Sequence, residues 1–234
     1  MGTTLHVDRE PSVAFSRFRR QERQLDLISL HVPKAFGTSI RDVLVHHYGR
    51  RRVTGDYARF LEDVGVSNED VGPPDLPRST AVVHGHFPAI RDAGVPARRR
   101  VAFLRDPIAR TISHYFFWLN EPPHGNPVHD RMLAEKSDLL TFASLPEIRW
   151  FYSRTIFGGA DLASFDLIGV VERLDRDWPR FQSLTGITAE LPHLNRNRYP
   201  AYAEAVSRAR ADDAGMQALH RLLDDDMRFY RRFL

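Results

Sequence analysis

The sequence of 234 residues contains no cysteine, and this absence excludes a disulfide framework and thiol chemistry. It also contains no run of about 18 apolar residues, the length that a transmembrane helix needs. The first ten residues, MGTTLHVDRE, lack the apolar core of a secretory signal, and His6 stands where a myristoylation signal has Ser or Thr. We therefore expect a soluble, cytoplasmic protein without a membrane span.

Lysine is also scarce. Among the 33 Lys and Arg residues, Lys occurs only at positions 34 and 136. Such an arginine bias is typical of a GC-rich genome, and it also fits an arginine-lined anion site, because the guanidinium fork matches phosphate and sulfate. In a chain that uses Arg almost everywhere else, Lys34 indicates a place where a compact ammonium group is needed.

The overall composition is that of a globular protein, with 42% hydrophobic residues, 27% charged residues and a net charge of +3. Apolar runs that predict buried strands alternate with segments of helical periodicity, and these runs are residues 26–32, 81–86, 101–104 and 166–171. This order predicts an α/β fold with a mostly parallel central sheet flanked by helices. We expect a single domain over residues 25–234, preceded by a polar, Arg-rich arm over residues 1–24.

Helical spacing and loop residues divide the rest of the chain. Helices are predicted over residues 38–48, from Pro107 onward, over 175–184 and in the tail from Arg208. Clusters of Pro and Gly predict loops at 65–79, 121–128 and 191–200. The acidic run 224–226 is interpreted as a solvated helix surface. Ligands of parallel sheets bind at the carboxyl ends of the strands, where the three candidate motifs lie.

The first candidate motif is PKAFGTS, residues 33–39, which follows the first predicted strand. A tight loop that enters a helix presents backbone N–H groups and the positive end of the helix dipole to an anion. Lys34 adds a charge, and Thr38 and Ser39 add hydroxyl donors. The spacing is not that of a Walker-A loop, in which Lys directly precedes Ser or Thr. The alternative is a helix capped by Thr38 or Ser39, with Lys34 merely solvated.

The second candidate motif is LRDPIARTIS, residues 104–113, again at a junction between a strand and a helix. Asp106 is suited to cap the helix, with Pro107 at its first position. Arg105 emerges at the end of the strand, and its long side chain can meet Ser113 around one anion. The alternative is that Asp106 and Arg110 form an ordinary surface pair at the spacing i, i+4.

The third candidate motif is the pair His84 and His86. Residues i and i+2 of a strand point to the same face, so both imidazoles can address one space. A histidine is suited to take a proton from a hydroxyl group near neutral pH. The alternatives are a pair of hydrogen-bonded core histidines and the start of a metal site, for which no acidic cluster has suitable spacing. Gly85 allows another group to approach closely.

In their order along the chain, the three motifs resemble those of the sulfotransferases that use 3′-phosphoadenosine-5′-phosphosulfate (PAPS). The resemblance is greatest to the carbohydrate branch with the heparan and uronyl 2-O-sulfotransferases. The segment HVPKAFGTSI is similar to the 5′-phosphosulfate loop of that branch, and VAFLRDPIARTISHY to its 3′-phosphate strand and helix. VVHGHFP is similar to its catalytic-histidine strand, while LIGVVERLD and LPHLNRN look like its later landmarks. The resemblance covers roughly residues 26–198.

The resemblance implies a P-loop-like sulfotransferase fold, PAPS as donor, adenosine 3′,5′-bisphosphate (PAP) as product, and no metal. The residues that would hold the 5′-phosphosulfate are Lys34, Gly37, Thr38 and Ser39, and those for the 3′-phosphate are Arg105 and Ser113. His86 would be the catalytic base with His84 assisting it, and Lys34 would offset charge on the departing phosphate. The chain departs from the family at Ala35 and Phe36, where Thr or Ser and then Gly are usual.

The resulting hypothesis is a soluble, bacterial sulfotransferase that moves a sulfuryl group from PAPS to a hydroxyl of a carbohydrate or another small-molecule metabolite. Two alternatives stay open. One is a nucleotide-dependent kinase with a divergent phosphate loop, and the other is a non-catalytic binder of anionic glycans or nucleic acid through the Arg-rich arm. For the sulfotransferase we expect no nucleic-acid partner.

Overall fold

The structure is a computed structural model, and it describes residues 24–57, 76–190 and 201–234. Three predicted segments lie mostly or wholly outside the described residues. They are the N-terminal arm 1–24, the proline-rich loop 65–79 and the loop 191–200 with its LPHLNRN motif.

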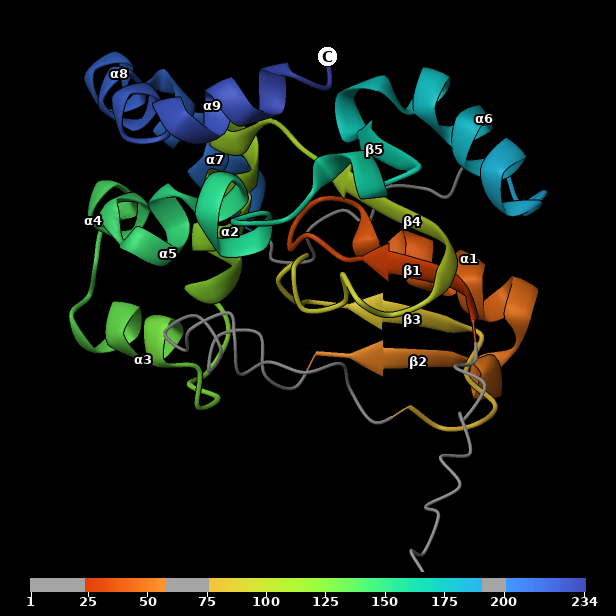
Figure 1. The fold of residues 1–234 in the computed structure, drawn as a ribbon. Coiled ribbons are helices and arrows are strands. Elements are labelled where there is room, and N and C mark those ends of the chain that lie inside the picture. The colour runs from red at the N-terminus through yellow and green to blue at the C-terminus, as the bar shows by residue number, and fades with distance from the viewer. Residues whose placement is uncertain (1–23, 58–75, 191–200) are drawn as a thin grey trace, which may run out of the picture.

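A five-stranded sheet forms the centre of the described chain, and each pair of neighbouring strands is parallel (Figure 1). The strand order is β2-β3-β1-β4-β5. The strands are β1 (Leu25–Leu30), β2 (Val53–Asp56), β3 (Val82–Gly85), β4 (Ala97–Leu104) and β5 (Leu167–Val170). Helices flank this sheet, so the predicted α/β class with a parallel central sheet is confirmed.

The helices predicted over 38–48, from Pro107 and over 175–184 begin within one residue of the predicted places, whereas the tail predicted to be helical from Arg208 begins earlier, at Tyr202, and is divided into three helices. The C-terminal half also adds several short helices. The helices are α1 (Gly37–Tyr48), α2 (Pro107–Trp118), α3 (Pro127–Ala134), α4 (Leu139–Ser144), α5 (Pro146–Arg149), α6 (Leu174–Thr185), α7 (Tyr202–Ala211), α8 (Asp213–Leu222) and α9 (Asp224–Arg231). Single turns are η1 (Arg50–Arg52), η3 (Leu162–Ser164) and η4 (Val171–Arg173), and η2 (Phe151–Ile156) is a π-helix. Within the described ranges, none of these helices is both long and apolar enough to span a bilayer.

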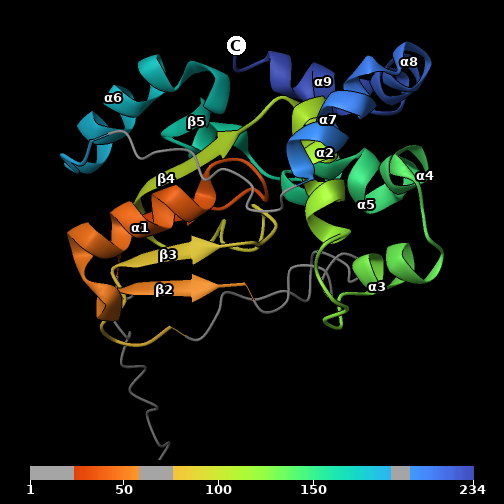
Figure 2. The ribbon, with the colours of Figure 1, turned by 180° about the vertical axis from the view of Figure 1, so that it is seen from behind.

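Apolar side chains on both faces of the sheet form the core. On one face, α1 and α6 pack against residues such as Val82 and Phe103. On the other face, η2 and α9 cover residues such as Val83 and Leu104. Figure 2 shows α1 lying across the first of these faces. Burial on both sides explains why the strands are almost continuously apolar instead of alternating with polar residues.

The sequence analysis missed β2 and the first half of β4. The strand β2 has only four residues, VTGD, and two of them are Gly and Asp, which are rare in strands. It forms because it pairs with β3 at the edge of the sheet. The strand β4 begins at Ala97, four residues before the predicted start, and its first part carries three arginines, two of them exposed, so no apolar run indicates it.

The acidic run 224–226 is not simply a solvated surface, and that interpretation was wrong for its last member. Asp226 is fully buried and accepts hydrogen bonds from the backbone N–H groups of Tyr152 and Ser153, at 2.8 and 2.9 Å. The Ser153 hydroxyl donates a third bond to it at 2.7 Å. The residue therefore joins α9 to η2, and sequence composition alone does not distinguish it from its exposed neighbour Asp224.

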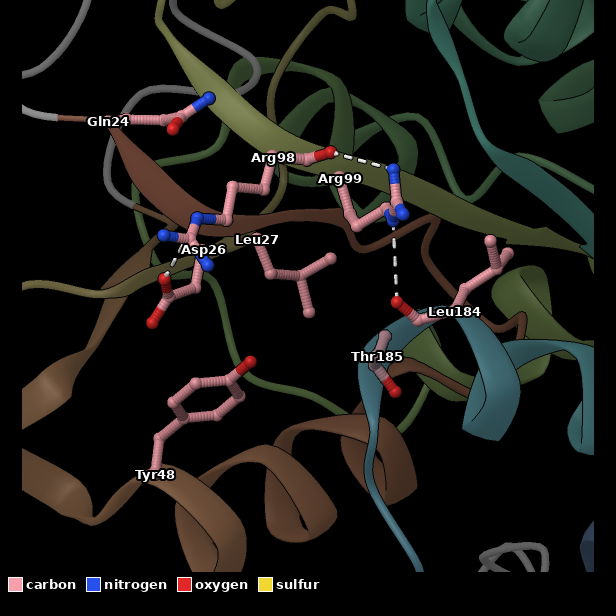
Figure 3. A pocket seen from close by; sticks show the side chains of 8 residues that line it. All are labelled: Gln24, Asp26, Leu27, Tyr48, Arg98, Arg99, Leu184 and Thr185. Atoms are coloured by element: carbon pink, nitrogen blue, oxygen red, sulfur yellow. Dashed lines mark hydrogen bonds and ion pairs between the residues drawn. The ribbon is translucent and has the colours of Figure 1, made fainter.

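A cavity of about 650 Å³ opens at the amino ends of the strands (Figure 3). Its lining includes residues from the starts of β1 and β4 and from the last turns of α1 and α6. Arg99 there already donates to the carbonyl oxygen of Leu184, at 3.4 Å, and is paired with Asp166 at 3.1 Å. The cavity is thus at the opposite end of the sheet from the three candidate motifs.

Candidate functional site

The three candidate motifs meet because β3, β1 and β4 are adjacent in the sheet and run in the same direction. The arrowheads of these strands point toward the helical layer that includes α2 (Figure 1). At this edge, β1 leads into the loop before α1, β3 leads to His86, and β4 leads to Arg105 and α2. The carboxyl ends of adjacent parallel strands are where α/β proteins bind their ligands.

The loop between β1 and α1 has an unusual backbone. Lys34 and Phe36 have φ angles of +64° and +73°, a region that side chains other than glycine rarely adopt. Ala35 is buried in the core, and the Phe36 ring packs against Phe103 and Trp178 with centroid distances of 6.0 Å. Ala35 and Phe36, the two residues at which this motif departs from the family pattern, therefore anchor the loop in the core.

The start of α1 differs from the capped helix of the alternative interpretation. The helix begins at Gly37, and its N-cap residue, Phe36, makes no side-chain cap hydrogen bond. Thr38 and Ser39 lie inside the first turn, with Thr38 exposed and Ser39 buried. The interpretation with a Thr38 or Ser39 cap was wrong. The start of α1 therefore has no side chain from its N-cap residue competing with an anion for the first-turn amides.

Two positive charges from different motifs lie side by side. The Arg105 guanidinium donates from Nη1 to the carbonyl oxygen of Lys34 at 3.3 Å. The Lys34 ammonium lies 3.9 Å from the centre of the Phe117 ring. Burial and then the charge of Arg105 lower the pKa of Lys34 to about 8. Since like charges held together repel, this arrangement favours the binding of anionic groups beside them.

The second motif forms the predicted junction. Asp106 caps α2 by accepting a hydrogen bond from the N–H of Ala109 at 2.8 Å, and Pro107 is the first helical residue. Ser113 lies in α2 and is buried. Arg110 is also fully buried, with its guanidinium 4.0 Å from the centre of the Phe151 ring. It is therefore not the surface partner of Asp106 that the alternative interpretation required.

His84 is tied to its surroundings through both ring nitrogens. Its Nδ1 lies 2.9 Å from the Ser29 hydroxyl, and its Nε2 lies 3.2 Å from the carbonyl oxygen of Gly37. A carbonyl only accepts, so Nε2 donates and Nδ1 accepts from Ser29. Burial lowers the pKa of His84 to about 3, which keeps the ring neutral. His84 thus connects β3 to β1 and to the first residue of α1.

His86 stands just beyond the end of β3 and is only partly buried. The next residue, Phe87, packs in the core and so fixes the chain at this point. Burial lowers the pKa of His86 to about 4, so its imidazole is neutral at physiological pH. A neutral imidazole can accept a proton from a nearby hydroxyl group.

Two further aromatic residues, His31 and Tyr57, surround His86. The ring of His31 is 4.4 Å from that of His86 and 5.0 Å from that of His84, measured between centroids. The Tyr57 ring is 4.9 Å from His86, and its hydroxyl lies 3.3 Å from Nδ1 of His31. Burial and the neighbouring imidazoles hold the pKa of His31 well below its usual value. The three imidazoles therefore share the site as neutral rings.

Two glycines make this crowding possible. A Cβ atom on Gly37 would lie 1.6 Å from the His31 ring, so only glycine leaves room for that imidazole. A Cβ atom on Gly85 would lie 1.7 Å from the backbone carbonyl oxygen of Asp56 in β2. The close approach expected at Gly85 is thus made by the neighbouring strand.

The sequence analysis did not include His31 and Tyr57 among the site residues. A signal for His31 was present, because it lies near the end of the predicted strand 26–32 and just before the phosphate-loop motif. What was missing was the register: the His31 N–H donates to Gly85 O at 2.8 Å, which sets His31 beside His86. Tyr57 follows β2, a strand that was itself not predicted.

Comparison with known proteins shows the family to which this chain belongs. The model of the sulfotransferase family matches residues 16–231, and the chain therefore belongs to this family of sulfuryl-group transferases. No curated protein matches the chain significantly. Among solved structures, the chain is similar to the crystal structure of mouse sulfotransferase SULT7A1 complexed with PAP. The two share 12% sequence identity over 83% of this chain and 67% of that chain, with a TM-score of 0.41.

Proposed function

We propose that this protein transfers a sulfuryl group from PAPS to a hydroxyl of a carbohydrate or another small-molecule metabolite. The observation that carries this proposal is the contact between Arg105 and the Lys34 carbonyl. This contact places the Arg105 guanidinium against the loop that leads to the uncapped start of α1, and the Lys34 ammonium is near enough for the charge of Arg105 to lower its pKa. A donor with anionic groups at both its 5′ and 3′ positions fits such a paired site, since each cation then has a phosphate to neutralise.

The residues divide between the two ends of this donor. Lys34 and the first-turn amides of α1, from Gly37 to Ser39, are suited to the 5′-phosphosulfate. Arg105 and Ser113 are suited to the 3′-phosphate, because a guanidinium and a hydroxyl both donate to phosphate oxygens. Among the described residues, no group of three or more His, Asp or Glu side chains is arranged to hold a metal ion.

PAPS supplies a sulfuryl group whose bond to a 5′-phosphate oxygen breaks as a bond to the acceptor oxygen forms. His86 takes the proton from the acceptor hydroxyl, because its ring is neutral and lies at the carboxyl end of β3, where the three motifs meet. Lys34 offsets the negative charge that grows on the phosphate oxygen. His84 assists by holding Gly37 in place through its Nε2. Positioning and electrostatics thus provide the catalysis.

PAP should stabilise the protein much more than AMP does. At about 100 times its dissociation constant, a ligand adds about 2.7 kcal/mol to the free energy of unfolding. For a domain of this size that corresponds to a Tm increase of roughly 5–11 °C. We expect this increase with PAP in the presence of EDTA, and a much smaller one with AMP at the same concentration. Thermal unfolding followed by fluorescence measures both.

Two variants make this measurement specific for the 3′-phosphate. Arg105→Ala should remove most of the difference between PAP and AMP. Arg98→Ala, an exposed arginine beside the cavity at the other end of the sheet, should leave it unchanged. Equal shifts for PAP and AMP in the unaltered protein would contradict the 3′-phosphate assignment. A requirement for Mg²⁺ with ATP would favour a kinase.

The rate should depend on pH through both His86 and Lys34. The base His86 has a pKa lowered to about 4, so kcat/KM for the donor should fall as the pH drops through about 4 and the ring becomes protonated. The Lys34 ammonium has a pKa lowered to about 8, so kcat/KM should also fall above about pH 8 as the charge is lost. The expected profile of kcat/KM is bell-shaped, and it reports the free enzyme.

The alkaline limb can be assigned with Lys34→Arg, whose guanidinium stays charged at these pH values. In this variant the decrease above about pH 8 should disappear, whatever its absolute rate. A decrease that persists in the variant would show that another group causes it. The Tm at each pH serves as the control for unfolding.

A further inference from the structure

Side chains from two distant segments hold the backbone on both sides of the Arg105–Asp106 peptide bond. The Tyr152 hydroxyl donates to the Arg105 carbonyl oxygen at 2.7 Å and accepts from the Arg105 N–H at 3.2 Å. The Glu172 carboxylate accepts from the N–H of Asp106 at 3.0 Å. Two consecutive N–H groups at the junction between β4 and α2 are thus fixed by side chains and not by the sheet.

Tyr152 reaches this junction from a buried and rigid position. It is fully buried in the π-helix η2, and its own N–H donates to Asp226 of α9 at 2.8 Å. Burial raises the pKa of the Tyr152 hydroxyl, which therefore remains a donor at physiological pH. The Arg110 guanidinium lies over the neighbouring Phe151 ring. Short π-helical segments are frequent at functional sites.

Glu172 belongs to the segment LIGVVERLD, to which the sequence analysis assigned no chemistry. It follows β5 in η4, and its second carboxylate oxygen accepts from the Tyr230 hydroxyl at 2.9 Å. Tyr230 and Asp226 are four residues apart in α9 and so lie on one face of that helix. One face of α9 therefore supports both contacts to the Arg105 junction, through Tyr152 and through Glu172.

We propose that Tyr152 and Glu172 are positioning residues that set the preference for a donor with a 3′-phosphate. Both act through Arg105, and the inference rests on the function proposed above. An arginine discriminates between ligands only if its fork is held within about 0.5 Å and 10–20° of the productive geometry. Arg105 starts at the end of a strand, where the sheet no longer restrains its backbone. The Tyr152 hydroxyl and the Glu172 carboxylate supply that restraint.

The first test is the affinity of Tyr152→Phe for PAP and for AMP, measured by isothermal titration calorimetry. The variant keeps the ring and loses only the hydroxyl. We expect the affinity for PAP to fall about 10-fold, the equivalent of one net hydrogen bond of about 1.4 kcal/mol. The affinity for AMP should stay within about twofold, because AMP lacks the 3′-phosphate that Arg105 is proposed to bind. The ratio of the two affinities should fall accordingly.

The matched control is Tyr115→Phe. Its hydroxyl is also buried and donates to a backbone carbonyl, that of Ser137, at 3.0 Å. It makes the same kind of bond away from the Arg105 junction. We expect this variant to lose a comparable amount of stability and to keep the ratio between the PAP and AMP affinities. Such an outcome would show that the loss of a buried tyrosine hydrogen bond does not by itself lower the ratio of the PAP and AMP affinities.

A second pair of variants tests Glu172, which is exposed and tolerates substitution better than the buried Tyr152. Glu172→Ala removes the acceptor for Asp106 and should also lower the ratio of the PAP and AMP affinities. Glu172→Gln keeps one carbonyl oxygen that can accept from the same N–H, and should restore most of the ratio. This pair decides the question if Tyr152→Phe does not fold.

The outcomes separate this inference from the proposed function. If the unaltered protein does not prefer PAP to AMP, the 3′-phosphate assignment fails and the inference fails with it. If the unaltered protein prefers PAP and both Tyr152→Phe and Glu172→Ala keep the full preference, only the positioning role is overturned. A loss of equal size for PAP and AMP would also overturn it, since it would indicate a general structural role.

Discussion

His86→Ala is expected to lower the rate of sulfuryl transfer by about 10²–10⁴-fold, the usual contribution of a general base. The affinity for PAP and the Tm should change little, because His86 stands beyond the end of β3 and its proposed role is to act on the acceptor and not on the nucleotide. The measurement is the initial rate with labelled PAPS and a hydroxyl acceptor identified by screening. Binding of PAP and thermal unfolding of the same preparation show whether the fold and nucleotide site are intact.

The matched control is His84→Ala, because His84 is two residues away and has both ring nitrogens occupied. Its loss leaves buried groups of Ser29 and Gly37 without their partner, at a cost of about 1–3 kcal/mol in the free energy of unfolding. This corresponds to a decrease in Tm of roughly 2–12 °C. We expect only a mild loss of rate at temperatures where the variant is folded.

Other patterns would assign the histidines differently. An inactive His84→Ala together with an unstable His86→Ala would mean that the two roles are exchanged. Normal turnover of both variants would place the base elsewhere. His31 is then the first residue to replace, since its ring is 4.4 Å from that of His86.

Lys34→Ala should lower the rate by about 10²–10³-fold, the range found when one donor to a developing negative charge is removed. Lys34→Arg should restore little of this loss. The ammonium group is compact and lies close to Arg105 and over the Phe117 ring, whereas a guanidinium is planar and wider. The measurement is kcat at saturating PAPS, so that weakened binding does not mask the effect.

The chain offers a matched control in its other lysine. Lys136 is exposed and, like Lys34, has a positive φ angle, of +50°. Lys136→Arg should leave the rate unchanged, which shows that exchanging Lys for Arg at a left-handed position is harmless by itself. Near-normal turnover of Lys34→Arg would mean that Lys34 acts only as a charge, and that its compact shape does not matter.

Sequence reasoning succeeded where the signal is carried by residues close together in the chain. Apolar runs indicated four of the five strands, because strands buried on both faces are apolar along their length. The cap at Asp106 and the helix start at Pro107 are local as well. The resemblance of the three motifs indicated the sulfotransferase family, which the family comparison confirms. The carbohydrate branch and the roles of the individual site residues stay predictions.

The residue types at the site, with Lys34, Arg105 and His86 each close to the carboxyl end of a strand, were determined by the sequence itself. Only the tertiary structure decided which of these groups meet, because strand order and register depend on contacts between distant residues. Register sets His31 beside His86, and packing buries Asp226 while Asp224 stays exposed. The hydroxyl that holds Arg105 comes from Tyr152, 47 residues further along the chain. Local periodicity contains no information about such a pairing, which forms only when η2 is packed between the sheet and α9.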